Sequence, residues 1–423
     1  MNRPKAVFYT LGCKLNQSES EELASQYRAA GYDVADGACE NALVRAEVAV
    51  VNTCTVTSKA EQKARRLIRA LLKADFSPQV IVRGCAARLE RAAFESLDKR
   101  PSGERRLVVQ TLAGVPPPVS GAFSKDGALD SSSSFRSRAL LKISDGCDNR
   151  CTFCRVRLAR GPARSVPAAQ LLEKLRALEA AGFAEASLTG VNTGCYSDGG
   201  LDLAALVESL LGGTNNIALR LSSLNPENCT EALLRLLKIN GKRLRPHIHL
   251  SVQSANTKIL RSMGRNYDAC LLRELMAKLR ETGDPFIACD IIAGFPGEGE
   301  AEFEDTLRFC EENGFAWIHA FPFSARPGTE AAGFRHKVPE REAAARVAML
   351  AKLARLGKRH YIERWLGRDV DAVSEGVYAT SENYLKIALP GREILPEKGG
   401  RLRCKIVKLC GGRHYDAEGE VIV

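Results

Sequence analysis

Residues 1–117 alternate short apolar runs with longer amphipathic stretches. Three apolar runs, KAVFYTLGC, AEVAVVNTC and PQVIVRGC, have the length of buried strands, and they end at Cys13, Cys54 and Cys85. A helix is expected over residues 16–30, and the segment SKAEQKARRLIRALLKA places its apolar positions on one stripe of a second helix. Buried strands that alternate with amphipathic helices predict an open parallel sheet with helices on its faces.

The alternation stops over residues 116–137, which are rich in Pro, Ser and Gly and are typical of a linker. A longer series of apolar runs and helical stretches then follows. Six strands are expected, and with the helices between them they predict a partial or full βα barrel of the TIM type. The expected strands are 139–144, 185–190, 217–221, 247–252, 286–292 and 315–321.

A long helical run over residues 339–366 is expected to close this barrel, and the pattern changes after it. Short apolar runs separated by Gly and Pro predict a small all-β barrel at the C-terminal end. The chain is therefore expected to be an α/β protein in four parts. These are an open parallel α/β domain over 1–117, a linker over 118–137, a βα barrel over 138–362 and a small β-barrel over 363–423.

Composition narrows the class of protein. The apolar content of 45% with 26% charged residues is that of a globular chain, and no run of about 18 apolar residues predicts a membrane span. The N-terminal segment lacks the apolar core of a signal peptide, so we expect a cytosolic protein. The net charge of +11 has two interpretations, ordinary surface charge or a polyanionic partner. Cysteines in a cytosolic chain indicate metal binding or catalysis rather than disulfides.

The loop after the first barrel strand carries Cys147, Cys151 and Cys154 in the pattern C-x3-C-x2-C. Three thiolates can hold three irons of a four-iron cluster and leave one iron open to a small ligand. A zinc knuckle is the alternative, because structural zinc also takes cysteine ligands. His247 and His249 are a poor completion of a zinc site, since HIHLSVQ has the pattern of a strand.

The three cysteines at the ends of the N-terminal strands form a possible second site. Ligands of open α/β sheets bind beyond the carboxyl ends of the strands, so Cys13, Cys54 and Cys85 could converge there. Three buried core cysteines are the equal alternative. The remaining cysteines have no ligand spacing, although Cys195 lies near a predicted strand end. They are Cys39, Cys195, Cys229, Cys270, Cys289, Cys310, Cys404 and Cys410.

Several motifs together resemble the radical S-adenosylmethionine (SAM) methylthiotransferases. The three-cysteine loop with Phe153 before its last cysteine is the radical SAM signature, and TLGCKLNQSESE, NTCTVT and GCAAR resemble the N-terminal domain of that family. LTGVNTGCY, RLSSLNPE, DIIAGFPGE and FSARPGTEAA match further along, and SENYLKIALP resembles a TRAM domain, a small RNA-binding β-barrel. Arg157 departs from the family, which has a proline there, but it removes no ligand.

The family has three branches with different substrates. One acts on isopentenyladenosine in tRNA, one on threonylcarbamoyladenosine at tRNA position 37, and one on an aspartate of a ribosomal protein. TLGCKLNQ, LTGVNTGCY and SENYLKI look most like the threonylcarbamoyladenosine (MtaB-type) branch. The resemblance therefore implies a tRNA methylthiotransferase that acts on C2 of that nucleoside and converts t6A to ms2t6A. A different class remains open, a non-catalytic iron–sulfur or zinc RNA-binding protein.

The resemblance also implies the cofactors. Cys147, Cys151 and Cys154 would hold a [4Fe–4S] cluster whose open iron binds SAM, and reductive cleavage of SAM would give a 5′-deoxyadenosyl radical. The N-terminal trio would hold an auxiliary [4Fe–4S] cluster that supplies the sulfur. A first SAM would methylate that sulfur, and a second would activate the adenine C2–H. An electron donor of the flavodoxin or ferredoxin type is implied, and a monomer is the default state.

Other residues are candidates for binding SAM, the nucleoside or RNA. Thr189, Gly190 and Asn192 match the family's segment that contacts the amino group of SAM. Ser222 and Ser223 could bond the ribose or carboxylate, Gln253 could contact the nucleoside, and Gly294 in GFPG allows close backbone approach to the adenine. An ordinary strand-end turn is the alternative for each. A helix near Cys54 offers a basic face for RNA with Lys59, Lys63, Arg65, Arg66, Arg69 and Lys73, although such a face is as often simply solvated. The C-terminal part, residues 363–423, has no net charge, but its run 398–413 contains six cations and no acid. The cations are Lys398, Arg401, Arg403, Lys405, Lys408 and Arg413. Tyr378 and Tyr384 could stack on the unpaired bases of an anticodon stem-loop.

Overall fold

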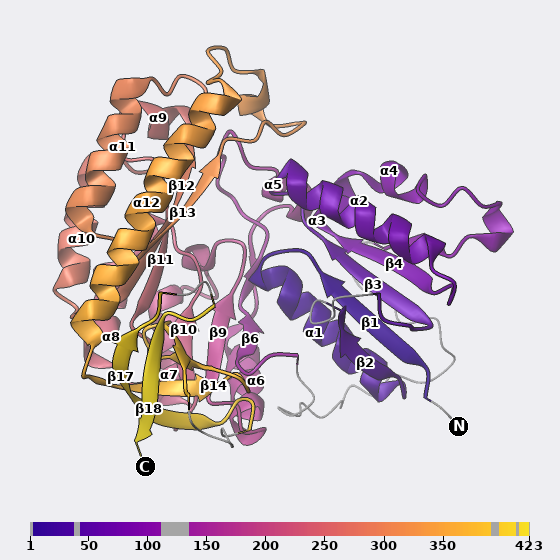
Figure 1. Cartoon of the computed structure of the whole chain (residues 1–423), viewed down its shortest axis with the longest axis horizontal. Helices are drawn as coiled ribbons and strands as arrows, with labels where there is room; N and C mark the ends of the chain where they lie inside the picture. The colour runs from indigo at the N-terminus through magenta and orange to yellow at the C-terminus, as the bar shows by residue number, and fades with distance from the viewer. Residues whose placement is uncertain (1–2, 38–42, 111–134, 391–396, 412–413, 423) are drawn as a thin grey trace. The chain divides into compact units, whose positions relative to one another are not determined.

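The computed structural model describes residues 3–37, 43–110, 135–390, 397–411 and 414–422 (Figure 1). The expected linker over 118–137 lies outside these residues except at its last three positions. The chain forms two compact units, one of residues 1–135 with 154–162 and one of 136–153 with 163–423. The division into three domains and a linker stays a prediction, since the second unit contains both the βα barrel and the small β-barrel.

The first unit is an open, fully parallel five-stranded sheet in the order β2-β1-β3-β4-β5. The three expected strands form its centre, because each supplies a run of buried apolar residues, and the central β3 is buried along its whole length. The two short outer strands were missed. The strands are β1 (Lys5–Thr10), β2 (Asp33–Asp36), β3 (Val48–Thr53), β4 (Gln79–Gly84) and β5 (Leu107–Val109).

Helices cover both faces of this sheet, as predicted. Tyr27 of α1 packs with Phe8 and Val50, whereas Ile68 of α2 packs with Val51, whose side chain points to the opposite face. Thr57 caps α2, since its side chain accepts a hydrogen bond from the amide of Ala60 at 3.2 Å. The helices of this unit are α1 (Lys14–Ala29), α2 (Ser58–Lys73), α3 (Cys85–Leu89), α4 (Arg91–Glu95) and α5 (Val156–Arg160).

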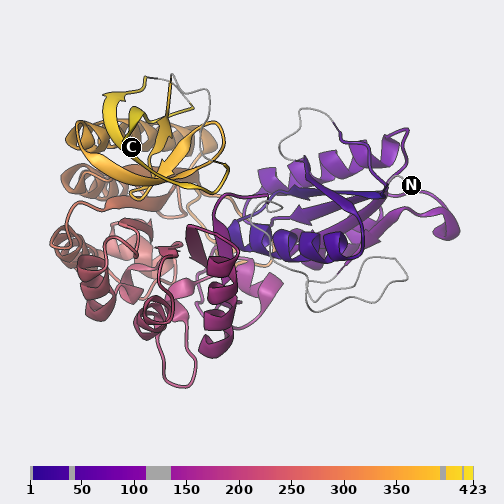
Figure 2. The same cartoon turned by 90° about the horizontal axis from the view of Figure 1, so that it is seen from below.

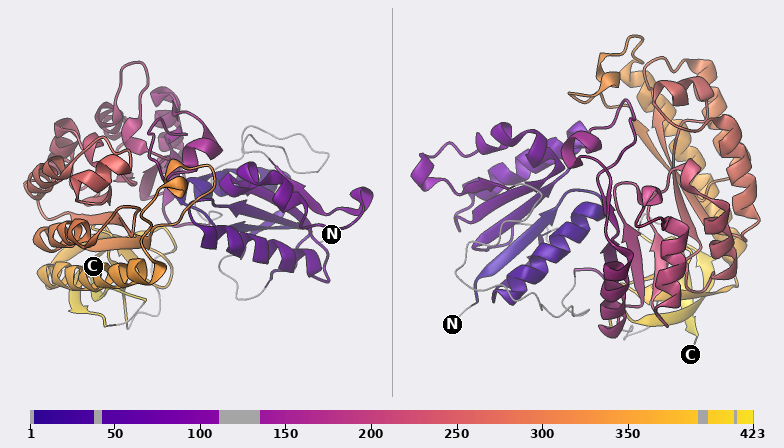
Figure 3. Two further views of the ribbon diagram at one scale, coloured as in Figure 1. Left: turned by 90° about the horizontal axis from the view of Figure 1, so that it is seen from above. Right: turned by 180° about the vertical axis from the view of Figure 1, so that it is seen from behind.

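The larger unit contains six parallel strands in two sheets of three, in the orders β10-β9-β6 and β11-β12-β13 (Figure 3, right). Bridges between Leu219 and Leu244 and between Leu224 and Leu250 join the sheets, so the strands form a partial barrel. This confirms the predicted TIM-like arrangement. Its strands are β6 (Ala139–Lys142), β9 (Glu185–Thr189), β10 (Ala218–Leu221), β11 (His247–Gln253), β12 (Phe286–Ala293) and β13 (Trp317–Pro322), and β7 (Ser144–Asp145) pairs with β8 (Arg164–Ser165) beside them.

The barrel helices pack their leucine-rich faces on the strands and begin where polar side chains cap them. Asp202, Thr230, Asn256 and Asp268 each accept hydrogen bonds from amides in the first turn of the following helix. The helices are α6 (Ala168–Ala180), α7 (Leu203–Gly212), α8 (Glu231–Ile239), α9 (Thr257–Ser262), α10 (Ala269–Arg280), α11 (Glu300–Asn313) and α12 (Glu340–Trp365). None of the helices in the described ranges is long and apolar enough to cross a membrane.

The C-terminal segment forms the predicted small β-barrel, which is closed in the order β14-β15-β16-β18-β17 (Figure 2). Its core is contiguous with Tyr361 and Ile362 of α12 and with Phe286 of β12. The sequence did not predict the short strand β15. The strands are β14 (Asp369–Ser374), β15 (Ala379–Ser381), β16 (Lys386–Ala388), β17 (Arg401–Leu409) and β18 (Ala417–Ile422).

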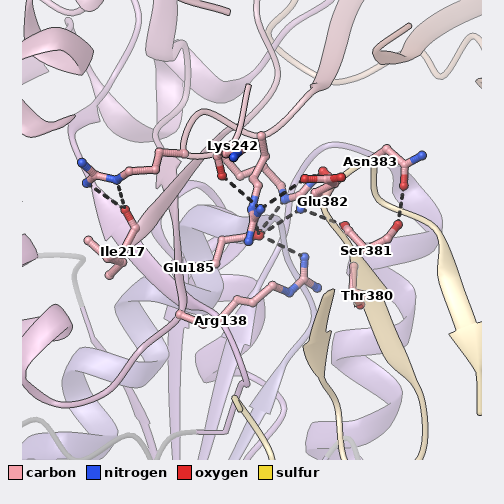
Figure 4. Close-up of polar contacts among 12 residues, drawn as sticks. Arg138, Glu185, Ile217, Lys242, Thr380, Ser381, Glu382 and Asn383 are labelled. Atoms are coloured by element: carbon pink, nitrogen blue, oxygen red, sulfur yellow. Dashed lines mark hydrogen bonds and ion pairs between the residues drawn. The ribbon is translucent and has the colours of Figure 1, made fainter. Parts of the chain in front are cut away.

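A buried charge cluster joins this β-barrel to the amino ends of the βα-barrel strands (Figure 4). Glu185, the first residue of β9, accepts hydrogen bonds from Arg220 at 2.6 and 3.0 Å and from Arg245 at 3.0 Å, and Arg138 lies 3.7 Å away. Arg220 also donates to the carbonyl oxygens of Ser381 and Glu382 in the β-barrel. The β-barrel therefore covers the amino-terminal face of the βα barrel. Active sites gather at the opposite face, where the strands have their carboxyl ends.

Candidate cluster sites and their surroundings

Cys13, Cys54 and Cys85 follow three neighbouring strands of the N-terminal sheet, β1, β3 and β4. Cys54 and Cys85 are buried and Cys13 is exposed. Burial raises the pKa of Cys85 to about 12, and the nearby Cys13 and Cys54 thiols add to this rise, while Arg160 opposes it. The thiols are close enough to affect one another, so the structure favours convergence at the sheet edge over three separate core cysteines.

A buried polar network holds the loops that carry these thiols. The side-chain Nδ2 of Asn16 donates to Asn52 Oδ1 at 2.7 Å, and Nδ2 of Asn52 in turn donates to the backbone carbonyl oxygen of Asn16 at 2.9 Å. Gly84 has φ +100°, and a Cβ there would lie 2.3 Å from the carbonyl oxygen of Thr53. Only glycine therefore allows β4 to turn so closely beside β3 and present Cys85.

An arginine that the sequence did not single out also reaches this trio. Arg160, at the end of α5, donates from Nε to Cys85 Sγ at 3.1 Å and makes a bidentate pair with Glu19 at 2.7 and 3.0 Å. The side chains of Arg160 and Glu19 are 1% and 6% exposed. Arg155 of the same segment donates to Glu90 at 2.7 Å, so two arginines anchor the segment after Cys154 to this unit.

The loop with Cys147 and Cys151 docks on the segment that follows α9. The amide and hydroxyl of Thr152 donate to the carbonyl oxygens of Met263 and Ser262 at 3.0 and 2.9 Å. Gly264 has φ +67°, and a Cβ there would lie 2.7 Å from the carbonyl oxygen of Arg150. Cys154 begins the segment that belongs to the first unit, and its Sγ accepts a hydrogen bond from the amide of Val156 at 3.4 Å. Arg157, the position that departs from the family, lies within α5.

A second arginine contacts this loop. Arg265 donates to Cys151 Sγ at 3.2 Å, to Asn225 Oδ1 at 2.9 Å, to the carbonyl oxygen of Ser251 at 2.7 Å and to the hydroxyl of Tyr267 at 2.8 Å. These contacts fix its guanidinium against the loop. Little in the sequence indicated that Arg265 contacts Cys151. A single arginine after SMG has no spacing that relates it to a cysteine 114 residues earlier.

Three predicted SAM-binding residues lie at the carboxyl end of β9. Thr189 is buried there, and its carbonyl oxygen accepts a hydrogen bond from Ile143. A Cβ on Gly190 would lie 2.3 Å from Ser144 Oγ, so the backbone passes close to the loop that leads to Cys147. Asn192 donates to Cys195 Sγ at 2.9 Å, and its Oδ1 is buried with no hydrogen-bond partner among the described residues.

The other predicted residues differ in their surroundings. Ser222 Oγ, just after β10, is buried without a partner in the described chain, whereas the carbonyl oxygen of Ser223 accepts from Thr193 at 3.2 Å. Gln253 ends β11 with φ +63°, a conformation that is uncommon for a residue other than glycine. Gly294 has φ +77°, and a Cβ there would lie 2.5 Å from the Cβ of Ala343, which explains the glycine by packing within the chain. Its role as a backbone contact to adenine stays a prediction.

Two functional candidates were missed. Ser144 Oγ and Glu227 Oε2 are buried, and neither has a partner in the part of the chain that the structure describes. Burial raises the pKa of Cys195 to about 11, and Cys147 and then Glu227 add to this rise, so Glu227 lies near the cysteine loop. Glu227 is the last residue of the family motif RLSSLNPE, but the motif gave it no role, because its approach to the loop depends on the turn after β10.

The comparisons with known proteins identify the family of this chain. Residues 141–310 match the radical SAM superfamily, and residues 5–103 match a family described as uncharacterized protein family UPF0004. The threonylcarbamoyladenosine tRNA methylthiotransferase MtaB of Treponema pallidum is 39% identical over 94% of this chain and 97% of its own length. The chain belongs to the radical SAM methylthiotransferase family. The predicted family and class of enzyme are thereby confirmed.

Two further relatives span most of the chain. MtaB of Thermotoga maritima is 35% identical over 86% of this chain and 85% of its own length. The tRNA-2-methylthio-N(6)-dimethylallyladenosine synthase of Chlorobaculum tepidum is 28% identical over 100% of this chain and 99% of its own length. Among solved structures, the radical SAM methyltransferase TsrM of Kitasatospora setae superposes with a TM-score of 0.51 at 14% identity, covering 78% of this chain and 75% of that one, which supports the fold.

Radical SAM methylthiotransferases use SAM and [4Fe–4S] clusters, so the predicted cofactors are confirmed at the level of the family. Among the described residues, no three His, Cys, Asp or Glu side chains are placed to hold a single metal ion. The unpartnered oxygens of Ser144, Asn192, Ser222 and Glu227 suit a polar ligand beside the loop of Cys147 and Cys151.

The charged surfaces of this methylthiotransferase differ from the sequence-based expectation. On α2, Arg65 pairs with Glu61 at 2.7 Å and stacks over Phe94, so it does not belong to the free basic face. The other five cations are exposed and form no ion pair with any described residue. They are Lys59, Lys63, Arg66, Arg69 and Lys73, which lie within one side of the helix.

Two cations in the basic run of the C-terminal barrel form ion pairs. Arg403 pairs with Asp369 at 3.4 Å and Lys408 with Glu418 at 3.5 Å. Arg401 donates to the carbonyl oxygens of Ala184 and Asn216. Arg413 lies outside the described residues.

Tyr384, which was expected to stack on bases, is instead packed within the second unit. Its ring lies 4.3 Å from that of His247 and beneath the guanidinium of Arg220 at 5.0 Å. This part of the predicted base-stacking surface is wrong. Tyr378 is half-buried and lies against Lys386 and Tyr415.

Proposed function

We propose that this chain methylthiolates C2 of N6-threonylcarbamoyladenosine at tRNA position 37. The observation that carries the proposal is the pair of three-thiol sites, since each set leaves one corner of a [4Fe–4S] cluster without a protein ligand. The MtaB relatives, at 39% and 35% identity over most of the chain, support this nucleoside over isopentenyladenosine, since two dimethylallyladenosine synthases are 28% and 32% identical.

Six cysteines would hold the two clusters, Cys147, Cys151 and Cys154 for the SAM-binding one and Cys13, Cys54 and Cys85 for the auxiliary one. When bound, these groups supply reductive cleavage of SAM and the sulfur that is inserted. The chain itself orients SAM: Glu227 Oε2 can accept a hydrogen bond from the ammonium group, and Ser222 Oγ can donate one to a carboxylate or ribose oxygen.

The proposal includes a tRNA anticodon stem-loop as the RNA partner, a reduced flavodoxin or ferredoxin as electron donor, and a location in the cytosol. The five free cations of α2 supply a sequence-independent contact with phosphates. Bases of an anticodon loop are unstacked, so the adenine C2 is accessible without opening a duplex.

Nucleoside mass spectrometry tests the substrate. In a strain that lacks the gene, tRNA should lose the methylthio group from threonylcarbamoyladenosine and recover it when the gene is returned. Loss of the group from isopentenyladenosine instead would assign the chain to that branch. Unchanged tRNA, together with binding of the purified protein to a ribosomal protein, would favour the aspartate branch.

A further inference from the structure

Each cluster site of this chain contains one arginine that donates a hydrogen bond to a ligand thiol. Arg265 lies 3.2 Å from Cys151 Sγ, and Arg160 lies 3.1 Å from Cys85 Sγ. The two contacts are alike in distance, and each lies within a single compact unit. Hydrogen bonds and charges next to the ligand sulfurs are among the main determinants of the reduction potential of iron–sulfur clusters.

The charge balance behind the two arginines differs. Arg160 makes a buried bidentate pair with Glu19. The buried Arg83 also interacts with Glu19 and with Glu22, so two carboxylates offset the two guanidinium charges of this cluster. Arg265 is held by an amide oxygen, a carbonyl oxygen and a hydroxyl, which carry no net charge.

The carboxylate of Glu227 interacts electrostatically with Arg265 but forms no ion pair with it. Its Oε1 accepts from the side chain of Asn225 at 3.4 Å, and its Oε2 has no partner among the described residues. No ion pair forms between Arg265 and any acid that the structure describes. Arg265 therefore places at Cys151 a positive charge that no ion pair with a described residue cancels.

A fixed positive charge favours the reduced cluster, because reduction adds one negative charge to the iron–sulfur core. In a buried site with an effective dielectric constant of about 20, a full charge at such a distance changes the reduction equilibrium by about tenfold or more. A cancelled pair has a much smaller effect, since the two contributions oppose each other.

We propose that Arg265 raises the reduction potential of the SAM-binding cluster, whereas the Arg160–Glu19 pair leaves that of the auxiliary cluster almost unchanged. A reduced flavodoxin or ferredoxin then delivers one electron preferentially to the cluster that must cleave SAM. The inference rests on the proposed binding of two clusters, but not on the identity of the nucleoside.

Reduction potentials measured on single-cluster forms of the full chain test this proposal. In the background C13A/C54A/C85A, which retains the SAM-binding cluster, Arg265→Gln should lower the equilibrium constant for reduction by about tenfold, or 59 mV for one electron. Arg265→Lys keeps the charge and should stay closer to the native value than Arg265→Gln. A change of less than threefold in Arg265→Gln, or an equal fall in Arg265→Lys, would overturn the proposal.

The auxiliary site supplies the matched control. In the background C147A/C151A/C154A, the double variant Glu19→Gln/Arg160→Gln removes a pair whose charges cancel and should change the equilibrium constant by less than threefold. A tenfold fall there would contradict the charge-balance argument. If the potentials are as expected but the native chain with both clusters does not methylthiolate threonylcarbamoyladenosine in tRNA, the proposed substrate is wrong and this inference stands.

A measurement on the unsubstituted residues covers the case in which Arg265→Gln does not retain its iron. With 15N-arginine incorporated into the C13A/C54A/C85A protein, pulsed electron paramagnetic resonance of the reduced cluster should detect a guanidinium nitrogen. Absence of that coupling would show that Arg265 does not contact the cluster ligand and would overturn the proposal.

Discussion

The carboxylate of Glu227 has one buried oxygen with no partner among the described residues, close to the loop of Cys147. An unpaired buried acceptor costs free energy unless a ligand satisfies it. The sequence predicted Thr189 and Ser222 as site residues, because apolar runs locate the carboxyl ends of barrel strands and active sites gather there. It could not predict Glu227, since the orientation of a loop acid depends on a turn that the pattern does not specify.

The first residue-scale prediction concerns SAM binding. Glu227→Gln removes the charge that would pair with the ammonium of SAM, so the affinity for SAM should fall by about tenfold, roughly 1.4 kcal/mol. Anaerobic equilibrium dialysis with the iron content measured in parallel tests this. Glu208→Gln, an exposed position on α7, is the control and should bind like the native protein. Native affinity in Glu227→Gln with full iron content would remove Glu227 from the site.

The second residue-scale prediction separates the two thiol trios. Cys85→Ala removes a ligand of the auxiliary site but leaves the loop of Cys147 and Cys151 intact, so SAM should still be cleaved while sulfur insertion is abolished. Chromatography with mass spectrometry measures 5′-deoxyadenosine and methylthiolated product in the same reaction. Cys270→Ala, at an exposed position without ligand spacing, should give both products. Methylthiolated product from Cys85→Ala would show that the auxiliary assignment is wrong.

At the scale of elements, α2 carries six cations and β17 four, and the two elements differ in which of these cations are free. The sequence shows both basic runs, yet it cannot show that Arg403 lies opposite Asp371 and pairs with Asp369, because that neighbourhood depends on strand pairing across the barrel. Helical spacing, by contrast, is local, so the common side of Lys63, Arg66 and Arg69 could be read from the sequence.

This difference predicts which element binds RNA phosphates. The variant Lys63→Gln/Arg66→Gln/Arg69→Gln removes three free charges from α2, so it should weaken tRNA binding. It should also reduce the slope of log affinity against log salt by about two to three. Filter binding at several salt concentrations measures both quantities. Arg403→Gln/Lys408→Gln is the control, since both cations are already paired, and it should retain most of the native slope. An unchanged slope in the α2 variant would exclude this helix from the RNA contact.

At the scale of the whole molecule, the predicted order of parts was correct because buried parallel strands appear as apolar runs of distinctive length. The sequence did not predict the short strands β2, β5 and β15, since three or four residues carry too little periodicity. The contacts of Arg160 and Arg265 with the cysteines were not predicted for another reason. Arg160 and Glu19 are 141 residues apart in sequence, so only the folded chain brings them together.

The attachment of the β-barrel to the βα barrel gives the last prediction. Burial alone would raise the pKa of Glu185, but Arg220, Arg138 and Arg245 lower it to about 2. Glu185→Gln would leave three arginines without their shared carboxylate, so the free energy of unfolding at pH 7 should fall by about 3–5 kcal/mol. Urea unfolding of the iron-free chain measures this, so that acid loss of iron does not contribute.

The contribution of Glu185 to the free energy of unfolding should decrease as the pH falls. A carboxyl group whose pKa is lowered by folding stabilises the native state fully above its unfolded value of 4.5, and this contribution is lost as the pH falls towards about 2. The difference between the native protein and Glu185→Gln should therefore shrink between pH 4.5 and 2. Glu231→Gln, whose side chain is 83% exposed, should unfold like the native protein at every pH. A difference that stays constant on acidification would mean that the charge of Glu185 does not hold the two barrels together, and that apolar packing against Tyr361 and Ile362 does so instead.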